Sequence, residues 1–69
     1  MQMFYFESSA IHGAAYDPDT RTLFIQFASG AKIYEYPDVP EHVFGGLLAA
    51  ESKGQYYASY IRDRYIPYK

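Results

Sequence analysis

Two short segments in which apolar residues alternate with other residues place the strongest constraint on the fold of this chain. Residues 22–27 read TLFIQF, residues 33–36 read IYEY, and Ser29-Gly30 lies between them. A period of two is typical of a strand with one buried face, and a Ser-Gly pair favours a tight reversal. The sequence therefore predicts an antiparallel hairpin.

Two further segments before this hairpin are expected to be extended. Residues 10–16 are followed by DPDT, in which Pro18 presets a turn dihedral and the aspartates can hydrogen-bond their own backbone. Residues Met1 to Phe6 read MQMFYF, an apolar segment that we interpret as a possible extra strand. If its edge were unpaired, it would favour homodimerisation.

The length of the hairpin loop decides which face Tyr34 and Tyr36 occupy, because a shift of one residue turns every side chain over. A two-residue loop places Tyr34 opposite Ile25 and Tyr36 opposite Leu23, in the core. A three-residue loop with Gly30 in the left-handed conformation puts both tyrosines on a partly exposed face instead. We favour the core position for Tyr36 and leave Tyr34 open.

The second half of the chain is expected to form two helices. Asp38-x-x-Glu41 resembles a capping box and predicts a helix near 39–50, whereas Ser52-x-x-Gln55 predicts a second helix over about 54–64. Gly45-Gly46 lies inside the first helix and costs roughly 1 kcal/mol per glycine relative to alanine. We expect a close approach of this helix to the sheet to compensate.

The second helix is rich in tyrosine. On a helical wheel its expected core face comprises Tyr57, Ala58, Ile61 and Tyr65. Tyr56, Tyr60 and Arg64 are four residues apart, so they form a continuous row elsewhere on the surface. The complete pattern predicts one α+β domain, a three- or four-stranded antiparallel β-meander followed by two α-helices packed on one face.

Composition limits the function. The chain has 69 residues and no cysteine, so packing must stabilise it, and its nine tyrosines and five phenylalanines supply large rings for a small core. Neither a signal peptide nor a membrane span is visible, and we expect a soluble cytoplasmic protein. Residues 1–50 hold two bases against six acids and residues 51–69 hold four bases against two acids, so the net charges are −4 and +2. The carboxy-terminal part is the basic end.

Several short motifs, taken in order, resemble one family. They are SSAI, YDPDTRTL, YEY, VP, LLAAESKGQYY and IRDRY. Between about Ser8 and Tyr65 the chain is similar to the KTSC domain, which is named after a carboxy-terminal extension of some lysyl-tRNA synthetases and also occurs as a stand-alone bacterial protein. This resemblance implies binding of RNA such as tRNA-like molecules, only by association with the synthetases.

The candidate binding residues combine tyrosines that could stack on bases with cations that could contact phosphates. They are Tyr34, Tyr36, Lys53, Tyr56, Tyr60, Arg62 and Arg64. A small protein-interaction or regulatory module is the alternative, since tyrosine and arginine are enriched at binding hot spots. His12 and His42 are isolated from any activating partner, so we expect no catalysis, no cofactor and no metal.

Overall fold

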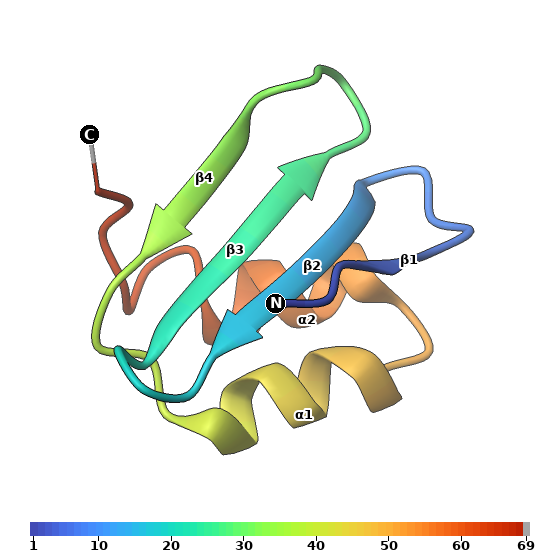
Figure 1. The fold of residues 1–69 in the computed structure, drawn as a ribbon. Coiled ribbons are helices and arrows are strands. Elements are labelled where there is room, and N and C mark those ends of the chain that lie inside the picture. Colours follow the sequence, from blue (N-terminus) through green and yellow to red (C-terminus); the bar gives the residue numbers. More distant parts are fainter. Residues whose placement is uncertain (69) are drawn as a thin grey trace.

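A computed structural model describes residues 1–68 of the chain. Four strands and two helices follow one another in the order β1, β2, β3, β4, α1, α2. Their bounds are β1 Phe4–Tyr5, β2 Ile11–Asp17, β3 Thr22–Phe27, β4 Ile33–Tyr36, α1 Glu41–Ala49 and α2 Lys53–Tyr60. The strands form an antiparallel sheet in sequence order, and in Figure 1 α2 lies behind the strands and α1 runs below them. The expected α+β meander with two helices on one face is confirmed.

The register of the sheet resolves the position of the two tyrosines. Tyr34 pairs with Ile25 and Tyr36 pairs with Leu23, as expected for the two-residue loop. Ladder pairing nevertheless ends at Gln26 and Ile33, so the connection is wider than a tight two-residue turn. Within residues 1–68 no glycine has a positive φ, which excludes the left-handed Gly30 bulge there.

The two predicted capping boxes behave differently. The hydroxyl of Ser52 accepts a hydrogen bond from the backbone N–H of Gln55 at 3.2 Å, so the start of α2 is capped as expected. Asp38 instead adopts a left-handed conformation with φ of 60°, and α1 begins at Glu41 without a side-chain cap. Pro40 occupies the capping position, and proline has no side-chain acceptor to offer.

The second helix is shorter than predicted, because it ends at Tyr60 and the chain continues as a turn through Arg64. In this turn the carbonyl of Ile61 accepts hydrogen bonds from the backbone N–H groups of Arg64 at 3.1 Å and Tyr65 at 3.0 Å. The row formed by Tyr56, Tyr60 and Arg64 therefore continues past the helix end.

The core lies between the sheet and the two helices. Its buried members are Ile11, Ala14, Leu23, Ile25, Tyr36, Val39, Val43, Leu47 and Ile61. Half-buried rings surround this cluster, and among them Tyr16 stacks on Phe44 with centroids 5.5 Å apart. The hydroxyl of Tyr16 donates to the carbonyl of Val39 at 2.6 Å, so this ring is anchored at both ends.

The reason for Gly46 is different from the one predicted. A Cβ atom at Gly46 would lie 2.2 Å from the hydroxyl oxygen of Tyr56, whereas a Cβ at Gly45 would meet nothing within 4 Å. The close approach is thus between α1 and a side chain of α2, and not between α1 and the sheet. Gly46 leaves the space into which the Tyr56 ring fits.

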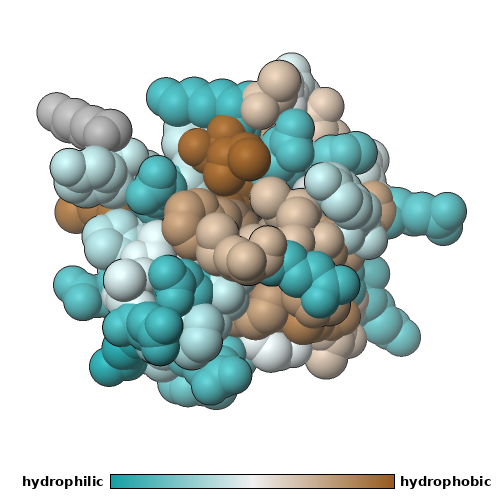
Figure 2. All heavy atoms as spheres, viewed as in Figure 1, coloured by the Kyte–Doolittle hydropathy of each residue, from teal (hydrophilic) through white to brown (hydrophobic). Residues whose placement is uncertain are grey.

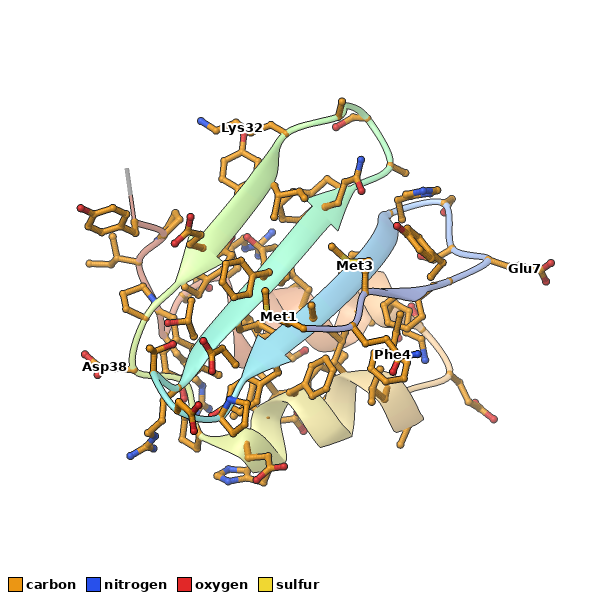
Figure 3. The ribbon with its side chains drawn as sticks, in the orientation of Figure 1. Met1, Met3, Phe4, Glu7, Lys32 and Asp38 are labelled. Atoms are coloured by element: carbon orange, nitrogen blue, oxygen red, sulfur yellow. The ribbon has the colours of Figure 1, made fainter. Side chains whose placement is uncertain are left out.

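The opposite face of the sheet is partly apolar and carries the amino-terminal segment. Figure 2 views this face and shows brown and tan side chains gathered over the strands. Tyr5 and Ile33 remain 67% and 45% exposed. Met1 and Met3 lie in front of the sheet in Figure 3, and the Met3 sulfur is 3.2 Å from where a Gly13 Cβ would be. The extra strand predicted within Met1 to Phe6 is therefore present, but it comprises two residues, Phe4 and Tyr5.

Among the helices of residues 1–68, neither has the length and apolar composition required to cross a membrane.

Candidate functional site

The expected row of Tyr56, Tyr60 and Arg64 is present. The rings of Tyr56 and Tyr60 are tilted at 39° with centroids 4.8 Å apart. The guanidinium carbon of Arg64 lies 5.9 Å from the centroid of the Tyr60 ring, within cation–π range. Tyr60 is half exposed, so this row offers an aromatic surface with a cation beside it.

Tyr56 is the fixed end of the row. Its hydroxyl donates to the carbonyl of Val43 at 3.0 Å, and its ring occupies the space above Gly46. Burial raises the pKa of the Tyr56 hydroxyl above its usual value, with a smaller contribution from Tyr60. The hydroxyl is therefore held neutral, as a donor to α1.

The row forms one wall of a pocket between the two helices. The pocket has a volume of about 500 Å³, within the range of small-molecule sites. Its lining residues are His42, Val43, Tyr56, Tyr60, Arg64 and Tyr65. Three of these residues, His42, Val43 and Tyr65, were not among the candidates from the sequence. His42 and Val43 come from α1 and reach the row only through packing of α1 on α2, and Tyr65 was expected on the core face.

Tyr36 does not lie on any accessible surface. Only 2% of it is exposed, and its hydroxyl shares a 2.9 Å hydrogen bond with that of Tyr57. Burial, and then this hydrogen bond, raise the pKa of Tyr36 well above its usual value. The core position favoured for Tyr36 is confirmed, and its predicted role in binding is corrected, since a ring without exposed area cannot stack on a ligand.

Tyr34 lies at the other end of the helix-facing side of β4 and is half-buried. Its ring packs edge-on against Phe27, with centroids 5.4 Å apart, and Lys32 Nζ lies 4.8 Å from its centroid. Lys32 extends away from the start of β4 in Figure 3. Tyr34 and Lys32 are therefore a second aromatic and cationic pair that does not line the pocket of the row.

The remaining two candidates are placed apart from the row. Lys53 Nζ donates to the carbonyls of Leu48 at 2.8 Å and Ala50 at 2.6 Å, so it satisfies the free carbonyls at the end of α1. It also lies 4.9 Å from the Phe6 ring centroid. Arg62 forms a 3.9 Å ion pair with Asp63 on the surface. Neither side chain lines the pocket.

His12, the other histidine in the chain, is exposed, and its ring lies 5.2 Å from that of Tyr5. Within residues 1–68 no three histidine, aspartate or glutamate side chains are grouped closely enough to hold a metal ion.

The fold and this pocket define a small α+β domain in which two helices on one face of a meander enclose an aromatic, cationic hollow. The sequence profile of the KTSC domain matches residues 7–65. The chain belongs to the KTSC domain family.

Relatives of known sequence and structure agree with this assignment. A crystal structure of a KTSC domain protein from Yersinia pestis superimposes with a TM-score of 0.90 at 35% identity, covering 99% of this chain and 94% of the other. A protein from Tsukamurella paurometabola is 46% identical over 59 residues, which are 86% of this chain and 87% of that one.

A third relative is much longer than this chain. A lysine–tRNA ligase from a Nostoc species is 44% identical over 59 residues, and the match covers 86% of this chain but 10% of the ligase. The present chain therefore corresponds to a small part of that enzyme.

Proposed function

We propose that this chain is a non-catalytic module that binds RNA through the row of Tyr56, Tyr60 and Arg64. The observation that carries the proposal is the half-exposed ring of Tyr60 between a second ring and a guanidinium group. Aromatic rings stack on unpaired bases regardless of their identity, and a neighbouring arginine can pair with phosphate oxygens. Tyr34 with Lys32 offers a second contact of the same kind.

The charge distribution supports a polyanionic ligand, and the name of one relative supports RNA as that polyanion. Although the chain has a net charge of −2, residues 51–69 carry +2, and all three residues of the row lie in this part of the chain. A region similar to this chain occurs in a Nostoc protein named lysine–tRNA ligase. Because that name includes tRNA, we propose tRNA, or another structured RNA, as the ligand of this chain.

The proposal is tested by adding unlabelled mixed tRNA to isotope-labelled protein at low and moderate salt. We expect amide shifts centred on Tyr56, Tyr60 and Arg64 that diminish as salt rises, because phosphate contacts release counterions. The variant Tyr60→Ala should weaken binding by about 5- to 150-fold, the value of one stacked base. The matched control Tyr68→Ala removes a ring that is 71% exposed and outside the row, and should leave binding unchanged. Absence of shifts at low salt would rule out the proposed function.

The exposed apolar face of the sheet supports a second candidate function, a protein-interaction module. β1 lies at the edge of the sheet, and Phe4 and Tyr5 pair with β2 on one side only within residues 1–68. Such an edge next to exposed apolar side chains favours pairing with another chain. We propose a homodimer through residues 1–6 as the form this interaction takes.

Light scattering measures this dimer directly. We expect a mass approaching twice the monomer value of 8.0 kDa at high protein concentration. Tyr5→Glu should return the mass to that of a monomer, because a charge on the apolar face disfavours its burial. A monomer mass for the unmodified chain at every concentration would exclude dimerisation through this segment.

A further inference from the structure

The residues that line the pocket between α1 and α2 define the chemistry of its ligand more closely than the row alone does. Val43, only 6% exposed, and the half-buried ring of Tyr65 give the pocket apolar surface, whereas His42 and Arg64 are exposed polar groups. The pocket is thus apolar in part and has nitrogen donors at its polar positions. A ligand that fits must combine a flat apolar part with an acceptor group.

The charge of the pocket favours an anion. None of its six lining residues is acidic. Within residues 1–68 the guanidinium of Arg64 forms no ion pair, in contrast to Arg62, which is paired with Asp63. A free guanidinium offers a planar fork of donors that matches a phosphate group.

The aromatic contacts favour a planar ring as the other part of the ligand. Tyr60 contacts Tyr56 and Arg64 and remains 50% exposed, so part of its ring is available for stacking. Tyr56 cannot swing away easily, because its hydroxyl is bonded to Val43 and its ring lies against Gly46. Tyr56 therefore gives Tyr60 a fixed ring to pack against before a ligand arrives.

We propose that this pocket binds a single unpaired nucleotide, with the base against Tyr60 and the phosphate at Arg64 and His42. This inference rests on the proposed RNA function and specifies its site. A volume of about 500 Å³ suits one nucleotide and is too small for a duplex. Structured RNAs present such unpaired bases in loops, bulges and ends, which are the usual targets of sequence-specific recognition.

The single arginine at the pocket sets the expected salt dependence of binding. Arg64 is the one charged residue of the lining and can neutralise one phosphate, so the slope of log affinity against log salt should be about −0.7 for a single-stranded ligand. A groove that follows many phosphates would give a much steeper slope. A short unpaired oligonucleotide measures this slope.

The direct test uses adenosine 5′-monophosphate, adenosine and inorganic phosphate as separate probes of the full chain by amide chemical shifts. We expect the monophosphate to perturb His42, Tyr60 and Arg64 with a roughly millimolar dissociation constant. Tyr60→Ala should weaken it by at least about 5-fold, and Tyr60→Phe, which keeps the ring, should not. Arg64→Gln should weaken the monophosphate but leave adenosine unchanged, whereas Arg21→Gln, an exposed arginine outside the pocket, should alter neither.

The outcomes separate this inference from the proposed function. If tRNA binds but the monophosphate does not perturb the pocket, or if phosphate alone reproduces all its shifts, the nucleotide site is wrong and RNA binding stands. If the monophosphate binds and tRNA does not, the pocket is a free-nucleotide site and the RNA function fails. If neither binds, both proposals are overturned.

Discussion

Replacing Ile61 by alanine is expected to lower the free energy of unfolding by about 2–5 kcal/mol, the usual loss for a fully buried aliphatic side chain. Ile61 is 0% exposed and lies in the core between the sheet and the helices. A domain of this length has a total stability of about 4–10 kcal/mol. The substitution should therefore remove a large part of it, and urea denaturation followed by circular dichroism measures the change.

Ile66→Ala is the matched control, since it makes the same chemical change at a side chain that is 84% exposed. We expect it to alter stability by less than about 0.5 kcal/mol. If Ile61→Ala does not fold, Ile61→Val should still show a loss of about 0.5–1.5 kcal/mol. Equal effects at the two isoleucines would contradict the packing described for the end of α2.

Ile61 also supports the geometry of the pocket through its backbone. Its carbonyl accepts the backbone N–H groups of Arg64 and Tyr65, two residues that line the pocket. The position of Arg64 beside Tyr60 is thus maintained by a residue whose side chain is buried in the core. Stability and site geometry are coupled at this turn.

Local patterns in the sequence were sufficient to predict β2, β3, β4 and the start of the second helix, but they left the pairing of residues 1–6 open. The alternation of Leu23, Ile25 and Phe27 depends on neighbours in the chain, and so does the cap that Ser52 gives to Gln55. The cap predicted at Asp38 failed because a positive φ turns this residue away from helix initiation and leaves Pro40 at the capping position. That conformation depends on the route of the chain between β4 and α1, for which the local sequence carries no direct signal.

The candidate site was predicted in part. The spacing of Tyr56, Tyr60 and Arg64 is a property of one helix, so a helical wheel was sufficient to find the row. His42 joins the row through packing of α1 on α2, and its position in a first helical turn gave no sign of this contact. The burial of Tyr36 depends on the hairpin register, for which the sequence left two alternatives.

Replacing each of the two adjacent glycines of α1 by alanine is expected to change the free energy of unfolding in opposite directions. Gly45→Ala should raise the free energy of unfolding by up to about 1 kcal/mol, since alanine is the better helix former and nothing lies within 4 Å of the added Cβ. Gly46→Ala gains the same helix propensity but places its Cβ 2.2 Å from the Tyr56 hydroxyl oxygen and 2.7 Å from the adjoining ring carbon. Overpacking of this kind costs about 1–3 kcal/mol. We expect a net loss of about 1–2 kcal/mol after the propensity gain is subtracted.

A double-mutant cycle assigns this loss to its cause. If Gly46 is required to accommodate Tyr56, then Tyr56→Ala should cost less stability in the Gly46→Ala background than in the unmodified chain. Additive effects, or a stabilisation by Gly46→Ala equal to that by Gly45→Ala, would show that the ring does not need this space. The two glycine variants should also differ in RNA binding. Gly46→Ala should displace Tyr56 and weaken RNA binding, whereas Gly45→Ala should leave the row and its affinity for RNA unchanged. Gly45 is exposed, whereas Gly46 lies against Tyr56. Comparing one added methyl group at each position therefore tests whether the contact between α1 and α2 is required for the pocket.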